Sequence, residues 1–279
     1  QYSTARYLGE RLRRELLSDV ALKVEEQAEG SFIVSGRGEF HLAILVEKMR
    51  REGYEFQVGK PEVILKEESG VRLEPFEDVY IECPEQYAGL VIEKMGIRKG
   101  EMVDMKLDRQ VASLHFTIPT RGLIGYRSEF LTDTKGEGIF NSLFRGYAPF
   151  LGVITVRPHG SLVASESGTS NFYGLLNAQE RGRLLIGPGV EVYEGMIVGR
   201  HAKPGDLVVN ACKEKHLSNV RSKGEGVAAH FDTPLVLSLE ECMEYLGDDE
   251  VLEVTPKSLR LRKTILKAVN RKREKNSKE

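Results

Sequence analysis

Helical and strand-like spacings of apolar residues alternate through roughly the first half of the chain. Residues 3–17 place four apolar side chains three or four positions apart, which predicts an amphipathic helix: Ala5, Leu8, Leu12 and Leu16. The spacings that follow predict a hairpin at 20–25 and 32–34, a helix at 39–53, and strands at 54–58 and 63–65. A polar link at 66–70 ends this first set of elements.

The first set of elements lacks only a leading strand to be the βαββαβ order of a ferredoxin-like domain. We expect the missing strand to lie upstream of Gln1. From Pro75 the order recurs complete, with strands at 79–83, 102–107, 111–118 and 138–144 and helices at 87–95 and 123–131. The Thr120-Arg121-Gly122 turn repeats Gly36-Arg37-Gly38 before the second helix, so we interpret the two sets as a tandem pair.

The final part of the chain has a different pattern, in which short β-type runs alternate with glycines. These runs predict a small antiparallel sheet or partial barrel from strands at 161–164, 184–186, 190–193, 196–198 and 207–211. The spacing of Ser238 and Glu241 is that of a capping box, which predicts a short helix to Leu246. A hairpin at 251–254 and 259–261 and a basic helix from about Thr264 follow.

The fold class predicted from these patterns is α+β, with three domains. Residues 1–74 and 75–154 would be ferredoxin-like, the first without its opening strand, and 155–279 would be a β-rich α+β domain. A chain of 279 residues that is 41% hydrophobic has enough apolar content for a core in each domain.

The charge is nearly balanced overall but unevenly distributed. The formal net charge is -2, yet residues 257–279 hold ten Lys and Arg against two Glu. The rest of the chain is therefore acidic. This asymmetry indicates a polyanionic partner at one end of the molecule.

Cysteine usage and hydropathy favour a cytoplasmic protein. The cysteines, Cys83, Cys212 and Cys242, are odd in number and widely spaced, a pattern that does not suit a disulfide framework. The apolar runs are far shorter than the ~18 residues of a membrane span. The start of the chain has neither Met nor a secretion signal, so we expect a piece of a longer protein. We also expect this protein to be cytoplasmic and monomeric.

Motifs of enzyme chemistry are missing from the sequence. It has neither a Walker loop nor a G-x-S-x-G elbow, and the glycines of 224–229 follow a charged loop instead of a buried strand. Cys212 and His216 are too few ligands for a zinc site. We interpret the acidic pairs, including 248–250, as solvated turns and strand edges, and predict no catalytic residue, metal or cofactor in this chain.

Basic segments are the exception to this lack of functional motifs. A loop between strand-like flanks combines cations, amide and hydroxyl donors and a glycine, which suits a phosphate backbone. Its candidate RNA contacts are Lys213, Lys215, His216, Asn219, Arg221 and Lys223. A merely solvated hairpin tip is the alternative interpretation of this loop.

Two further groups of residues are weaker candidates for RNA contacts. Arg260, Arg262 and Lys263 form a second basic cluster, and beyond Arg271 a solubilising tail is an equal alternative. Arg37 and His41 lie at the start of a predicted helix, where N–H groups attract anions. Helix capping or domain packing explains this pair equally well.

Several long strings resemble one protein family. The string that begins Val34-Ser-Gly-Arg-Gly-Glu-Phe-His-Leu resembles a segment in the third domain of translational GTPases, including elongation factor G. The strings at 119–132 and 189–199 are similar to the BipA/TypA branch of these GTPases. Those at 206–210, 215–224 and 248–263 strengthen this resemblance, which extends over essentially the whole chain.

The resemblance implies a bacterial ribosome-binding GTPase of five domains, connected with stress, growth at low temperature and assembly of the large ribosomal subunit. It also implies that this chain corresponds to the last three domains, without the domain that binds GTP and Mg2+, and is itself no enzyme. The loop at 213–223 would then reach ribosomal RNA and a tRNA in the A site.

Two other hypotheses remain open from the sequence alone. The tandem ferredoxin-like pattern also suits a metabolic protein that senses a small ligand between its modules. A stand-alone RNA-binding protein would differ only in what precedes Gln1.

Overall fold

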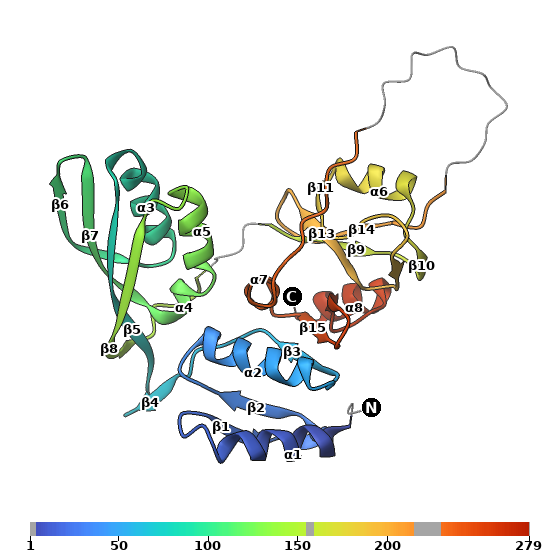
Figure 1. Ribbon diagram of the computed structural model, residues 1–279, viewed down its shortest axis with the longest axis horizontal. Helices are drawn as coiled ribbons and strands as arrows, with labels where there is room; N and C mark the ends of the chain where they lie inside the picture. Colours follow the sequence, from blue (N-terminus) through green and yellow to red (C-terminus); the bar gives the residue numbers. More distant parts are fainter. Residues whose placement is uncertain (1–3, 155–158, 215–229, 279) are drawn as a thin grey trace, which may run out of the picture. The chain divides into compact units, whose positions relative to one another are not determined.

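The computed structural model describes residues 4–154, 159–214 and 230–278, which fold into two compact units (Figure 1). The central unit is Pro61–Arg157, and the outer unit joins Gln1–Lys60 with Pro158–Glu279. Both mix helices with small sheets, which confirms the predicted α+β class. Within the described residues, no helix is long and apolar enough to span a membrane.

The central unit is one antiparallel sheet with its helices on one face. Its elements are β4 (Lys66–Glu68), β5 (Val71–Pro84), α3 (Glu85–Ile97), β6 (Glu101–Asp108), β7 (Val111–Pro119), α4 (Thr120–Leu123), α5 (Tyr126–Asp133) and β8 (Ile139–Pro149). The sheet order is β4-β5-β7-β6, and β8 also pairs with β5. The strand expected at 63–65 is not formed, and the predicted polar link instead contributes β4.

The core of the central unit follows the alternation of β5 and β7. Val79, Ile81, Leu114 and Phe116 point to the face that α3 and α5 cover. The helix expected at 123–131 is divided into α4 and α5, because Gly125 adopts φ 70°, a left-handed conformation that interrupts the helical path.

A buried ion pair fixes the predicted Thr120-Arg121-Gly122 turn, which in the structure forms the start of α4. The carboxylate of Glu74 is fully buried, contacts the guanidinium of Arg121 and accepts a hydrogen bond from the Leu151 amide at 2.8 Å. The Arg121 guanidinium also lies 4.4 Å from the centroid of the Phe150 ring. This turn therefore has a structural role that the sequence pattern did not reveal.

The outer unit begins with two helices and a hairpin. The elements are α1 (Ala5–Leu16), β1 (Lys23–Glu26), η1 (Ala28–Gly30), β2 (Phe32–Ser35), α2 (Glu39–Arg51) and β3 (Phe56–Gly59). The predicted apolar stripe of α1 packs through Leu8, Leu12 and Leu16 against Leu45 and Met49 of α2. The helix and hairpin predicted for this part of the chain are thus confirmed.

The remaining strands and helices of the outer unit come from the last part of the chain. They are β9 (Ser161–Ala164), β10 (Gly168–Thr169), α6 (Phe172–Gln179), β11 (Gly182–Leu184), β12 (Glu191–Val192), β13 (Ile197–His201), β14 (Leu207–Val209), α7 (Leu239–Tyr245), β15 (Glu250–Val254), β16 (Leu259–Lys263) and α8 (Ala268–Lys278). Four strands form a sheet in the order β11-β13-β9-β14. The expected antiparallel arrangement is wrong for β14, which runs parallel to β9.

Strand β3 pairs with β15, far away in the sequence, so the two ends of the chain share the sheet β16-β15-β3. In this sheet Val58 lies opposite Leu252, and both belong to a core that includes Ala43 of α2 and Met243 of α7. Ser238 and Glu241 form the predicted capping box at the start of α7. The division into domains at 1–74, 75–154 and 155–279 stays a prediction.

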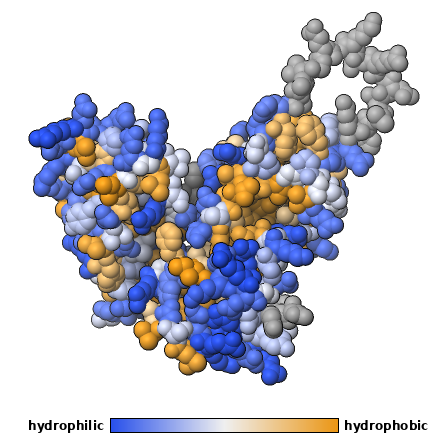
Figure 2. Space-filling model, in the orientation of Figure 1, coloured by the Kyte–Doolittle hydropathy of each residue, from blue (hydrophilic) through white to orange (hydrophobic). Residues whose placement is uncertain are grey.

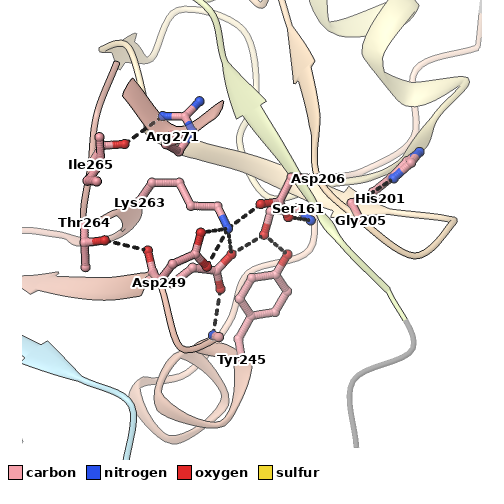
Figure 3. A network of polar contacts seen from close by, with 12 residues as sticks. Ser161, His201, Gly205, Asp206, Tyr245, Asp249, Lys263, Thr264, Ile265 and Arg271 are labelled. Atoms are coloured by element: carbon pink, nitrogen blue, oxygen red, sulfur yellow. Dashed lines mark hydrogen bonds and ion pairs between the residues drawn. The ribbon is translucent and has the colours of Figure 1, made fainter. Parts of the chain in front are cut away.

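A buried polar network crosses the outer unit (Figure 3). The ammonium of Lys263, in a residue only 2% exposed, lies 2.9 Å from carboxylate oxygens of both Asp249 and Glu250 and also contacts Asp206. The Ser161 hydroxyl donates to Glu250 at 2.8 Å and lies 3.0 Å from the Tyr245 hydroxyl. The network therefore connects the ends of β9, α7, β15 and β16.

Burial lowers the pKa of Lys263, but the carboxylates of Glu250, Asp206 and Asp249 outweigh burial and raise the pKa above its ordinary value. A lysine whose pKa is raised on folding stabilises the protein fully below the unfolded pKa, about 10.4. This contribution is lost only as the pH rises through the folded value. The charged network is therefore intact at neutral pH.

Replacing Lys263 by Met should destabilise the protein strongly, because it leaves the buried carboxylate of Glu250 without its cation. We expect the free energy of unfolding in urea to fall by about 3 kcal/mol. The double variant Lys263→Met/Glu250→Gln should recover part of this loss, since the uncompensated charge is removed.

The control is Lys267→Ala, at an exposed position, for which we expect a change within about 0.5 kcal/mol. A loss for Lys263→Met no larger than that of the control, or additive losses in the double variant, would contradict a coupled buried network.

Candidate nucleic-acid interface

Helix α6 contacts both chain segments that flank residues 215–229. Asn171 caps the start of α6, where its side-chain oxygen accepts a hydrogen bond from the Gly174 amide at 2.9 Å. The side-chain nitrogen of Asn171 donates to the carbonyl of Cys212 at 2.6 Å. The same asparagine therefore starts the helix and holds the segment that leads into the basic loop.

Gln179, the last residue of α6, makes the corresponding contacts on the other flank. Its side chain donates to the His230 carbonyl at 3.0 Å and accepts from the Asp232 amide at 2.8 Å. The rings of Phe172 and Phe231 lie 5.6 Å apart and add an apolar contact. Since an α-helix rises about 1.5 Å per residue, the two anchoring residues, Asn171 and Gln179, lie roughly 12 Å apart along the helix axis.

Only one of the six predicted loop contacts lies within the described residues. Lys213 is exposed, and its ammonium lies 6.0 Å from the centroid of the Tyr173 ring on α6. The other predicted contacts are outside the described residues: Lys215, His216, Asn219, Arg221 and Lys223. The structure therefore describes the two flanks of the loop and the helix that contacts them.

The second predicted cluster lies on β16, and its three cations have different environments. Arg260 is half-buried. The side chain of Arg262 is 13% exposed, donates to the Glu253 carboxylate at 2.7 Å, and donates to the Lys263 carbonyl at 2.8 Å. Glu253 also accepts a hydrogen bond from the Tyr193 hydroxyl at 2.7 Å. Arg262 is thus part of a packed polar group.

The position of Lys263 does not fit its predicted role as an RNA contact, because its ammonium is buried among three carboxylates. Those carboxylates, of Asp206, Asp249 and Glu250, have oxygens within 4.8 Å of one another, a spacing that could hold a metal ion. The ammonium of Lys263 supplies the positive charge there. The interpretation of 248–250 as solvated carboxylates is wrong for Glu250, whose side chain is fully buried.

Arg37 and His41 lie at the start of α2 as expected. The two ring nitrogens of His41 are both engaged, one with the Arg37 amide at 3.2 Å and the other with the carboxylate of Asp19. The hydrogen bond from His41 lowers the pKa of Asp19. These contacts favour the packing alternative for His41, whereas the side chain of Arg37 is exposed.

Helix α6, which contacts both flanks of the basic loop, is the element that the sequence patterns missed. Its buried residues are Gly174, Leu175 and Ala178, so its apolar stripe is only about one turn long. The available signal was Asn171, a strong capping residue directly before the apolar stretch.

Comparison with known families identifies two segments of the chain. Residues 159–268 match the model of the TypA/BipA C-terminal domain. Residues 71–157 match the model of the elongation factor G C-terminus. Together the two matches contain strands β5 to β8 of the central unit, without β4, and the described flanks of the basic loop.

Curated relatives match nearly the whole chain. The large ribosomal subunit assembly factor BipA of Bacillus subtilis is 52% identical over 269 residues, which is 95% of this chain and 44% of that protein. The putative elongation factor TypA-like SVR3, chloroplastic, of Arabidopsis thaliana is 49% identical over 264 residues, 94% of this chain and 39% of the relative. BipA of Salmonella typhimurium is 42% identical over 276 residues, 98% and 46% of the respective chains.

The chain thus spans less than half the length of these curated relatives. The identity is nevertheless high and extends through both compact units. By its sequence, the chain belongs to the BipA/TypA family of translational GTPases.

Proposed function

We propose that this chain is a ribosome-docking part of a BipA/TypA protein, and that its basic loop at 213–223 contacts ribosomal RNA and a tRNA in the A site. The observation that carries the proposal is the attachment of both loop flanks to α6 through Asn171 and Gln179. A loop held at both ends loses less conformational entropy when it binds. Relatives named as large ribosomal subunit assembly factors support the association with ribosomes.

The fold supports a finer proposal about the two N-terminal domains. In the central unit, the order β8-β5-β7-β6 with α3 and α5 on one face suits a ferredoxin-like βαββαβ domain. We propose the same fold for the N-terminal domain, completed by a strand from outside this chain. These domains would act as spacers that position the loop.

The activity of the whole protein is also a proposal. We infer that the parent protein hydrolyses GTP with Mg2+ in a domain outside this chain and acts in large-subunit assembly, under stress or at low temperature. This chain would act in the cytoplasm, as a monomer, by binding alone.

Reversing charges in the basic loop should weaken binding to large ribosomal subunits. We expect Lys215→Glu/Arg221→Glu/Lys223→Glu to reduce the affinity at least about tenfold, since each lost phosphate contact removes counterion release. For the unaltered chain, six phosphate contacts would give a slope of log K against log salt of roughly -4 to -5. Sedimentation binding over a series of salt concentrations measures both quantities.

The matched control reverses three exposed lysines elsewhere, Lys23→Glu/Lys135→Glu/Lys203→Glu, and should leave most of the affinity intact. If the two triple variants bind equally well, the loop is not the contact. Neither should change the melting temperature much, because exposed charges contribute little stability.

Loss of the α6 contacts should weaken binding without removing a charge. We expect Gln179→Ala to lower the affinity for large subunits about threefold, because the flank at 230–232 loses two hydrogen bonds. The salt slope should be unchanged, since the number of phosphate contacts stays the same.

Asn177→Ala is the control within the same helix, because among the described residues its exposed side chain bonds only to the Tyr173 carbonyl one turn earlier. Equal affinities for the Gln179 and Asn177 variants would show that the attachment of the flank does not matter.

A further inference from the structure

The sheet of the central unit has a second face, opposite the one that its helices cover. The register defines this open face, because directly opposed residues of antiparallel strands point to the same side. One row across the sheet is Leu143, Asp78, Thr117 and Glu101; the next is Asn141, Tyr80, His115 and Asp104. A third row is Ile139, Glu82, Ser113 and Lys106, and Asp108 lies opposite Val111 beyond it.

Carboxylates outnumber cations on the open face. The acidic residues in the rows are Asp78, Glu82, Glu101, Asp104 and Asp108, against Lys106 and, beside them on β8, Arg145. Arg145 lies 3.3 Å from Asp78, and Lys106 lies 3.4 Å from Asp104. Since both cations already face a carboxylate, the surface presents a net negative potential to any partner.

The open face also exposes apolar and aromatic surface. Leu143 is 64% exposed, Ile139 55% and Tyr80 44%, and the Tyr80 ring stacks on His115 with 4.4 Å between the ring centroids. In Figure 2, hydrophilic residues cover much of the β6 and β7 edge, with hydrophobic residues among them. Exposed apolar and aromatic side chains among charged ones are typical of a protein interaction site.

We propose that this open face binds a lysine- and arginine-rich segment of a partner protein. Charge complementarity supports this occupant, because the acidic edge along β6 attracts cations while Leu143, Ile139 and Tyr80 supply the apolar contact. A phosphate backbone would instead be repelled by Glu101, Asp104 and Asp108. The proposal is independent of the RNA contacts of the basic loop and concerns different residues.

The probe for this face is a short fluorescein-labelled peptide of alternating lysine and leucine, and binding is followed by fluorescence anisotropy. We expect Glu101→Lys/Asp104→Lys/Asp108→Lys to weaken binding about tenfold or more. The matched control, Glu68→Lys/Glu93→Lys/Glu137→Lys, changes the net charge equally at exposed positions away from the open face, and should stay within about twofold.

An apolar pair of variants separates a built surface from simple charge attraction. Leu143→Ser should weaken peptide binding about threefold, because apolar area that the peptide covers is lost. Leu131→Ser, on α5 and 45% exposed, should have no effect. Circular dichroism confirms the fold of each variant, and Leu143→Ser tests the proposal if the charge-reversed triple does not fold.

Three results would overturn the proposal. One is an equal loss of peptide binding in the two charge-reversed triples, and another is equal binding by the two leucine variants. The third is a gain of about tenfold in peptide affinity when residues 268–278 are removed, since the basic helix α8 of this chain would then be the occupant.

Discussion

The ion pairs of the Lys263 ammonium are the interaction on which the outer unit depends most. It contacts carboxylates from the start of β14 and from the start of β15, and Glu250 in turn accepts a hydrogen bond from Ser161 at the start of β9. Neither the lysine nor Glu250 could be buried alone without a large desolvation cost. Together they tie the four-stranded sheet to the sheet that β3 joins, and therefore the last part of the chain to the first.

Local elements were largely predictable, because their signals lie close together in the sequence. The capping box of Ser238 and Glu241, the stripe of α1 and the alternation of β7 each involve neighbours within a few residues. The pairing of Val58 with Leu252 and the parallel pairing of β14 with β9 could not be predicted, since both join distant segments. The burial of Glu250 could not be predicted either, for the same reason. Its partners Lys263 and Ser161 come from other strands.

In the candidate site, too, local features were predictable and contacts between distant segments were not. Its basic residues were recognisable from composition, whereas their surroundings were not. Lys263 looks like its neighbours in the sequence but is enclosed by carboxylates, and Arg262 is held by Glu253. The support given by α6 depends on Asn171 and Gln179, two amides whose partners are main-chain groups elsewhere in the chain. A polar side chain that bonds to distant main-chain groups leaves no periodic signal.

The central claim is that the loop held by α6 touches RNA, and site-specific crosslinking tests it most directly. A photoreactive amino acid in place of Asn219, with a second variant carrying it in place of Asn177 on α6, would be irradiated on large ribosomal subunits. The account predicts crosslinks to ribosomal RNA from position 219 that exceed those from position 177 and disappear at high salt. Crosslinks from position 219 only to protein, or an equal RNA yield from both positions, would contradict it.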